Sequence, residues 1–400
     1  MYSHDSFGLG HLRRCRTIAL ALVRHRPDLS VLILSGSPII GNFEFCHRVD
    51  FVRIPGIIKL HDGEYTPLSL DIGIEETLTI REEIIRRTAE AFRPDLFIVD
   101  KEPLGLRGEV KDTLTMLKAK GIPLILGLRD VMDEPVLLAE EWDRKNVLPA
   151  LTDLYDDIWI YGLPEICNAL EGISLPSVAE AKIRYTGYLK REASHTQRPA
   201  TASVPITHGP YFLVTPGGGG DGGALIDWVL SAYEYDSGIP CPALIVLGPF
   251  MRSAQQSAFL ERVHRLDRVE AITFEAHLEN FIDAAAGVIA MGGYNTFCEI
   301  LSFDKPALLV PRKKPRLEQY IRACRAEALG LVRSVETEGP RDPAVMARLL
   351  RALPNQRKPS QVQIPGLLDG LPTISRMVDH WLAGRGQQAP VLRAANLSGI

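Results

Sequence analysis

The sequence has few cysteines, no long apolar run and no excess of basic charge. Six cysteines occur in 400 residues, and no two of them form a CxxC pair. This scatter argues against a disulfide framework or a zinc site, and it favours reduced thiols in a cytoplasmic protein. No stretch reaches the apolar length of a transmembrane helix. The six cysteines are Cys15, Cys46, Cys167, Cys241, Cys298 and Cys324.

The charge balance excludes further functions. A formal net charge of -4 argues against a general nucleic-acid binder, so we expect no nucleic-acid partner. No Asp-x-Asp motif stands at the end of a predicted strand, and we expect neither a metal nor a cofactor. One basic run, residues 312–316 (RKKPR), is either a solvated face or a contact for phosphates or lipid headgroups. Peripheral membrane contact therefore stays open.

Length and hydrophobic pattern indicate two α/β domains. Four hundred residues exceed what one hydrophobic core usually serves. Short apolar runs such as Ser30–Ser35 and Leu96–Val99 are typical of parallel strands, and they alternate with predicted helices. This pattern predicts two Rossmann-like, doubly wound domains. The predicted parts are a first domain over 1–189, a linker over 190–209, a second domain over 210–365, a terminal helix within 366–384 that could return to the first domain, and a disordered tail over 385–400.

The first glycine turn ends in a histidine. Residues 1–5 look like the end of a strand, so either the true start lies upstream or this strand is very short. Gly8, Gly10 and His11 follow, and then the apolar pattern of a helix. A histidine can act as a base near neutral pH, and a helix N-terminus disfavours its protonated form. His11 is therefore a candidate base, with a capping or packing histidine as the alternative interpretation.

A carboxylate stands at the end of a neighbouring strand. Asp100 directly follows the run Leu96–Val99. The carboxyl ends of parallel strands form the edge at which α/β proteins place their sites. Asp100 is therefore a second candidate, although it could instead cap the turn at residues 101–103.

Two further glycine turns lie in the second domain. Residues 216–223 hold six glycines in seven consecutive positions, an entropic cost that suggests close approach of backbone to a ligand. This loop is neither a GxGxxG motif nor a P-loop. The other turn, Gly292-Gly293, connects the strand at 288–291 to a helix that carries Glu299. A glycine turn before a helix N-terminus suits a diphosphate, and Glu299 is placed to bind ribose hydroxyls. A plain tight turn and a solvated glutamate are the alternatives.

These motifs together resemble a known enzyme family. Residues 211–335 resemble the donor-binding domain of GT-B glycosyltransferases of the MurG type, family 28, through GGYNTFCE at 292–299, Asp-Lys-Pro at 304–306 and Glu-Gln at 318–319. That family has glycine where this chain has Asp304, which is a departure. Residues 7–11, FGLGH, resemble the amino-terminal glycine loop and catalytic histidine of the same superfamily.

The resemblance implies a fold, a reaction and a set of residues. The fold would be GT-B, with two Rossmann-like domains facing across a cleft. His11, oriented by Asp100, would be the base in a metal-free, inverting transfer from a nucleotide sugar, by default UDP-linked, to an undetermined carbohydrate, lipid-linked or small-molecule acceptor. Diphosphate departure would be stabilised by backbone amides. The implied donor-binding residues are Gly292, Gly293, Asn295, Thr296, Glu299, Phe274 through its backbone, Glu318 and Gln319, and the implied phosphate or acceptor loops hold Gly8, Gly10, Gly217, Gly218, Gly219, Gly220 and Asp221.

Three other functions stay open. Residues 10–15, GHLRRC, are also similar to the signature of PseG-like nucleotide-sugar hydrolases, which share the GT-B fold and transfer the sugar to water. A nucleotide-sugar 2-epimerase is a weaker alternative, because its extra acid and base carboxylates cannot be assembled from this sequence. A non-catalytic sugar-nucleotide binder is disfavoured by the presence of His11 and Asp100. A long irregular loop at 55–74 could shape an acceptor site, which favours transfer.

Overall fold

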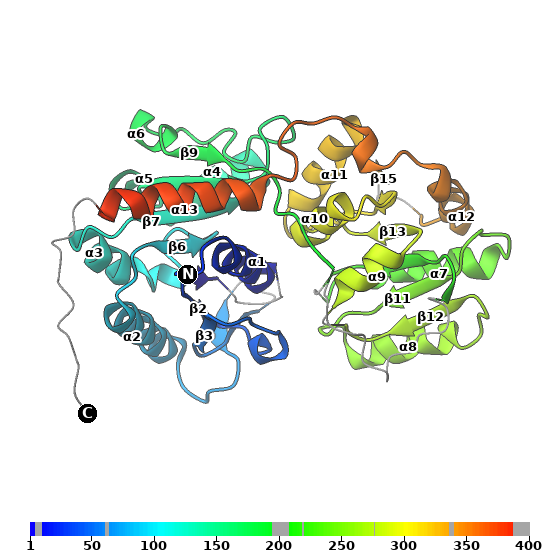
Figure 1. Ribbon diagram of the computed structural model, residues 1–400. Coiled ribbons are helices and arrows are strands. Elements are labelled where there is room, and N and C mark those ends of the chain that lie inside the picture. The colour runs from blue at the N-terminus through cyan, green and yellow to red at the C-terminus, as the bar shows by residue number, and fades with distance from the viewer. Residues whose placement is uncertain are drawn as a thin grey trace, which may run out of the picture.

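Two parallel sheets, each flanked by helices, stand next to each other in the computed structural model (Figure 1). The structure describes residues 1–4, 10–60, 64–193, 208–217, 220–275, 277–335 and 340–386. Among these residues, no helix is both long enough and apolar enough to span a membrane. The doubly wound α/β architecture follows from the alternation of apolar strands and helices in the sequence.

The first domain is built on a seven-stranded parallel sheet of order β3-β2-β1-β6-β7-β8-β9. Its strands are β1 (Tyr2–Ser3), β2 (Val31–Ser35), β3 (Val49–Arg53), β6 (Phe97–Asp100), β7 (Leu124–Arg129), β8 (Asp157–Tyr161) and β9 (Ile183–Tyr185). Its helices are α1 (Gly10–His25), α2 (Ile74–Phe92), α3 (Lys111–Ala119), α4 (Pro135–Arg144), α5 (Leu148–Asp153) and α6 (Ser177–Glu180).

The segment at 55–74 differs from the irregular loop that we expected. It contains an antiparallel hairpin of β4 (Ile57–Lys59) and β5 (Tyr65–Pro67). Ile57 is buried, and Leu68 N donates to Gly56 O at 2.9 Å, which extends the pairing beyond β5. The polar and glycine residues of this segment hid a short apolar pairing from the sequence pattern.

The second domain is built on a six-stranded parallel sheet of order β12-β11-β10-β13-β14-β15. Its strands are β10 (Phe212–Thr215), β11 (Ala243–Val246), β12 (Val269–Ile272), β13 (Gly287–Ala290), β14 (Ala307–Leu309) and β15 (Arg333–Ser334). Its helices are α7 (Gly223–Tyr235), α8 (Ser253–Val263), α9 (Leu278–Ala284), α10 (Tyr294–Ser302), α11 (Glu318–Ala328) and α12 (Pro343–Ala352).

The last helix, α13 (Gly370–Gly386), lies against the first domain (Figure 1). It packs on α1, and His25 Nε2 lies 2.7 Å from Asp379 Oδ2. The chain crosses over where Gly187 and Gly370 meet. A Cβ atom on Gly187 would lie 2.4 Å from Gly366 O, so only glycine fits there. The expected tail at 385–400 is corrected at its start, because α13 continues to Gly386, while residues 387–400 lie outside the described residues.

The two domains share a buried interface. Tyr188 of the first domain stacks on Tyr294 of α10, with ring centroids 6.0 Å apart, and meets Phe297 edge-on. Beside them, Arg322 of α11 pairs with Asp130 through two hydrogen bonds of 2.7 and 2.6 Å, and both side chains are 0% exposed. Tyr188 donates a third hydrogen bond to Asp130 Oδ2. These contacts fix how the two strand-end edges face each other.

Candidate active site between the two domains

His11 and Asp100 are brought together at the carboxyl edge of the first sheet. His11 lies in the first turn of α1, and Asp100 is the last residue of β6. His11 Nδ1 lies 2.5 Å from Asp100 Oδ2. Asp100 is 1% exposed and also receives two hydrogen bonds from Arg14, at 2.7 and 2.5 Å. The Arg14 guanidinium therefore holds the pKa of Asp100 well below its usual range despite burial.

Burial keeps the His11 ring neutral. It lowers the pKa of His11 to about 4, and Asp100 only partly offsets this effect. With Asp100 ionised, the tautomer that donates from Nδ1 to Asp100 leaves Nε2 as a proton acceptor. Arg14 Nη2 lies 2.9 Å from the same Nδ1, but both groups are donors in this tautomer, so Arg14 supports the ring through its hydrogen bonds to Asp100. This is the arrangement of a fixed imidazole base.

The glycine turn Gly292-Gly293 of the second domain faces the His11–Asp100 pair. Gly292 has φ +80, a left-handed conformation that favours glycine, and a Cβ atom on Gly293 would meet nothing within 4 Å. Gly293 precedes α10 and brings no side chain to cap its first turn. The amide groups at the start of α10 are therefore placed to receive an anion.

Asn295 links the turn at Gly292-Gly293 to the turn before His11. Its Nδ2 donates to Gly10 O at 3.0 Å, and its Oδ1 accepts from Arg191 Nη2 at 2.7 Å. Arg191 also hydrogen bonds Thr17 on α1. Arg191 lies in the segment that we predicted as a linker, yet it is buried; residues 194–207 of that segment lie outside the described residues. Thr296, the next residue of α10, is 8% exposed.

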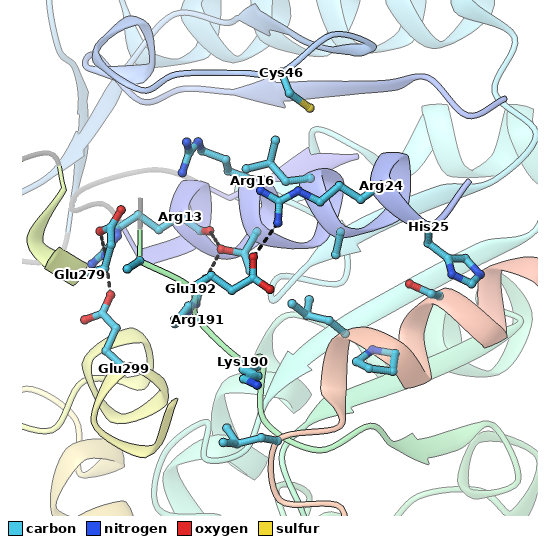
Figure 2. A pocket seen from close by; sticks show the side chains of 18 of the residues that line it. Arg13, Arg16, Arg24, His25, Cys46, Lys190, Arg191, Glu192, Glu279 and Glu299 are labelled. Carbon is cyan, nitrogen blue, oxygen red and sulfur yellow. Dashed lines mark hydrogen bonds and ion pairs between the residues drawn. The ribbon is translucent and has the colours of Figure 1, made fainter. Parts of the chain in front are cut away.

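Glu299 is held by an arginine of the first domain. It is 1% exposed, and its Oε1 accepts a hydrogen bond from Arg13 Nη2. Its Oε2 is buried and has no hydrogen-bond partner among the residues that the structure describes. Figure 2 shows Arg13 reaching from α1 towards Glu299 and Glu279. A ribose could reach this carboxylate only if Arg13 moved aside.

A cavity of about 950 Å³ extends from this ion pair along α1 (Figure 2). Residues at successive turns of α1 form one wall, and the chain at 43–46, the connection at 190–193 and the start of α13 form the others. Arg24 and Glu192 pair at 2.7 Å across it. Arg191 and Glu299 both line the cavity, and within the described part of the chain neither Arg191 Nε nor Glu299 Oε2, both buried, has a hydrogen-bond partner.

A second group of predicted residues gathers around Arg312. Arg312 Nη2 donates to Glu318 Oε1 at 2.9 Å, and Arg312 Nε lies 3.1 Å from Asp221 Oδ2. Gln319, with its amide oriented so that both ends are satisfied, accepts from Arg312 and donates to Met291 O. Glu318 Oε2 is buried, and no described residue forms a hydrogen bond with it. Glu318, Gln319 and Asp221 therefore share one cation at the edge of the cleft.

The remaining predicted residues have fewer observed contacts with His11, Glu299 and Arg312. Phe274 is half-buried after β12, and its side chain has no ring contact with His11, Glu299 or Arg312 among the described residues. Gly217 has φ +95, and Gly220 begins the turn that leads into α7. Gly8, Gly218 and Gly219 lie outside the described residues.

The departure from glycine at Asp304 has a structural explanation. Asp304 has φ +52, the left-handed conformation for which glycine is favoured. Aspartate tolerates this conformation better than most residues do, because its short side chain can form local hydrogen bonds. Here the carboxylate accepts hydrogen bonds from Ser360 N and Ser360 Oγ, both at 2.8 Å.

Most of the basic run at 312–316 points into the protein. Arg316 pairs with Asp133 and Glu141 of the first domain, at 3.3 and 2.8 Å. Arg312 pairs with Asp221 and Glu318. Lys313 lies 4.4 Å from the centre of the Tyr320 ring. Only Lys314 and Pro315 of the run are exposed; Arg316 joins the two domains, and Arg312 pairs within the second domain.

Comparisons with known proteins point to glycosyltransferases. Residues 225–361 match the glycosyltransferase family 28 C-terminal domain. A relative from Methanosarcina acetivorans, described as an uncharacterised glycosyltransferase, is 25% identical over an alignment of 394 positions that covers 93% of this chain and 95% of its own length.

Two solved structures show the fold. Acinetobacter baumannii MurG superposes with a TM-score of 0.55 at 13% identity, covering 96% of this chain and 98% of its own. Phytolacca americana UGT2, complexed with UDP-2fluoro-glucose and pterostilbene, superposes with a TM-score of 0.61 at 14% identity, covering 95% of this chain and 98% of its own. The predicted GT-B fold and the resemblance to MurG-like glycosyltransferases are thus confirmed, and the comparisons support glycosyl transfer.

Proposed function

We propose that this protein is an inverting, metal-independent glycosyltransferase that moves a sugar from a UDP-sugar to an acceptor hydroxyl. One observation carries the proposal: a neutral imidazole fixed by Asp100 lies directly beside an anion-receiving helix start from the other domain. The hydrogen bond of 3.0 Å between Asn295 Nδ2 and Gly10 O joins the two parts. A base and a diphosphate site are then neighbours, as in-line displacement at an anomeric carbon requires.

In the proposed reaction the acceptor hydroxyl attacks the anomeric carbon while the bond to the diphosphate breaks. His11 Nε2 takes the hydroxyl proton, and ionised Asp100 stabilises the imidazolium that forms. Amide groups at the start of α10 take up the charge that develops on the departing diphosphate. Gly292, Gly293, Asn295 and Thr296 form this part of the site in the proposal.

The donor would lie along the second domain. Glu299 would bind ribose hydroxyls once Arg13 is displaced, and Glu318 and Gln319 would bind hydroxyls of the sugar. The backbone near Phe274 would bind the base edge, and the glycine loop at 217–221 would lie near phosphate or acceptor. The UDP-2fluoro-glucose in Phytolacca americana UGT2 supports a UDP-linked donor for this chain.

The direct test is product formation. The protein is incubated with UDP-glucose, UDP-N-acetylglucosamine or UDP-galactose and a mixed acceptor library, and glycosylated products are detected by mass spectrometry with and without EDTA. We expect a product from at least one donor at the same rate in EDTA. Turnover that EDTA abolishes and Mg²⁺ restores would contradict the metal-independent mechanism.

A nucleotide-sugar hydrolase is the second candidate. The His11–Asp100 pair would activate water by the same proton transfer, so this pair alone does not choose between the two reactions. The two functions differ in whether donor cleavage depends on an acceptor.

Replacing Glu299 by alanine should weaken UDP binding by about 1–3 kcal/mol, the scale of hydrogen bonds to a charged group. The matched control is Glu192→Ala, an exposed carboxylate on the wall of the same cavity, which should leave affinity unchanged. Calorimetric titration of UDP measures both variants. Equal UDP affinities of wild type and Glu299→Ala would show that Glu299 does not bind the ribose.

The rate should depend on pH through a base of unusually low pKa. Because burial lowers the pKa of His11 to about 4, kcat/KM should stay constant from pH 7 to about pH 5 and fall only nearer pH 4. A fall centred near pH 6.5 would mean that His11 is not the base, or that its environment differs when substrate is bound.

Stability must be followed in the same experiment. The pKa of His4 is also lowered by burial, to about 3. Between pH 6.5 and 4 the unfolded chain therefore binds more protons than the folded one, so stability falls as pH falls in this window. Circular dichroism at each pH separates unfolding from protonation of the base.

A further inference from the structure

Arg129 is a largely buried arginine at the cleft without a partner. It ends β7, next to β6, which ends in Asp100. Its Nε is buried and has no hydrogen-bond partner, and no hydrogen bond or ion pair is found for its guanidinium among the described residues. Burying a charge without a partner is unfavourable, and burial lowers the pKa of Arg129 to about 10.

A second cation lies beside it. Lys101 directly follows β6, and its backbone N donates to Gly127 O of β7 at 2.8 Å. Its side chain is 13% exposed and lies 3.3 Å from Glu102 Oε1, but Glu102 is also bound by Lys145 at 2.8 Å. Burial lowers the pKa of Lys101 to about 8; Glu102 opposes this change, and the positive charges of Arg129 and Arg316 add to it.

The other carboxylates that act on this pair are already paired with other cations: Glu318 with Arg312, Asp130 with Arg322, and Glu141 with Arg316 and Lys145. Arg14 and Arg322, the other cations that act on Arg129, each have a buried carboxylate of their own, Asp100 and Asp130. Lys101 also acts on His11, and Asp100, the partner of His11, ends the strand next to the one that Arg129 ends. Such a site is satisfied by an anion that arrives with a ligand.

We propose that Lys101 and Arg129 bind a phosphate or carboxylate group of the acceptor, close to the hydroxyl that His11 activates. This inference rests on the proposed function and names the chemical class of the acceptor. Both cations belong to the first domain, as His11 does. Glu318 of the second domain is the strongest negative charge acting on Arg129, and it is paired with Arg312.

The first test needs no ligand. Arg129→Met replaces a buried, unpartnered charge by an apolar chain of similar length. If the arginine is kept for binding, the melting temperature of the variant should rise above that of wild type. Arg348→Met, at an exposed position on α12, is the control and should not change it. A fall in the melting temperature of Arg129→Met alone would show a structural arginine and overturn the proposal.

The second test measures anion binding. Inorganic phosphate is titrated calorimetrically into wild type, Arg129→Met and Lys101→Met, each with and without saturating UDP. We expect phosphate to bind UDP-loaded wild type and to bind each cleft variant at least tenfold more weakly, with the UDP affinity unchanged. Equal phosphate affinity of wild type and both variants, or an absence of phosphate binding to wild type, would overturn the proposal.

Two further arms separate the possible failures. Loss of affinity for UDP-glucuronate but not UDP-glucose in Arg129→Met would place the anion on the donor and overturn the assignment to the acceptor. If wild type binds none of the nucleotides, the proposed function fails, whereas the phosphate titration without UDP still decides whether Arg129 and Lys101 form an anion site.

Discussion

Replacement of His11 by alanine is expected to lower turnover by about two to four orders of magnitude, the usual contribution of a positioned general base. The acceptor hydroxyl would have no group to take its proton, because Nε2 is the acceptor nitrogen of a ring that Asp100 holds through Nδ1. UDP affinity should change little, since the donor contacts in this account come from the second domain. Steady-state rates and UDP titration measure the two effects separately.

The matched control is His25→Ala. His25 lies at the other end of α1, is 44% exposed on its side chain and pairs with Asp379. It should retain wild-type turnover. A His11→Ala variant that loses UDP binding in proportion to its rate would show that His11 binds the donor and is not the base.

Removal of Arg322 is expected to have the largest effect on stability. Arg322→Met leaves Asp130 buried and unpaired between the domains, where both side chains are now 0% exposed. Breaking a buried ion pair by removing one partner costs about 3–5 kcal/mol. Arg322 Nη1 also donates to Gly292 O at 2.9 Å, so the glycine turn at 292–293 loses a support. Urea denaturation followed by circular dichroism measures the loss.

The control compares a buried with an exposed ion pair. Arg351→Met removes the partner of Asp236 at the surface and should change the unfolding midpoint little. The double variant Arg322→Met/Asp130→Leu should recover part of the stability, because no unpaired charge is then buried. An Arg322→Met protein as stable as wild type would show that this pair does not hold the domains together.

The local parts of the site could be predicted from the sequence. Apolar runs that end in Asp100 or in Gly292-Gly293 indicate strands and turns because a few consecutive residues determine them. The carboxyl ends of parallel strands meet at one edge, so His11 and Asp100 could be expected to lie close together. The motif around Glu299 similarly indicated the donor domain.

The contacts between the domains could not be predicted in the same way. Arg13 and Glu299 are separated by 286 positions, and Arg322 and Asp130 by 192. No periodicity relates residues so far apart, although Arg13 and Arg14 stand in the quoted GHLRRC motif. No sequence feature indicated that Arg191 is buried between the domains, because it lies in a segment whose composition indicates a linker. Arg129 was visible only as an arginine at a strand end.

The same limit applies to the basic run at 312–316. A sequence shows five residues with four positive charges, but it does not show that Asp133 and Glu141 of the other domain face Arg316. The charges of Arg312 and Arg316 are therefore paired inside the protein. Lys314 is the exposed charge of this run that could contact a lipid headgroup or a phosphate.

The most direct test of the central claim is release of nucleotide from UDP-, dTDP- and GDP-sugars with and without the acceptor library, for wild type beside His11→Ala. The account predicts that wild type releases nucleotide from one UDP-sugar only when acceptor is present, and that His11→Ala does not. Fast, His11-dependent release without acceptor would contradict transfer and make the protein a hydrolase. Equal release by wild type and His11→Ala in the presence of acceptor would contradict the assignment of the base.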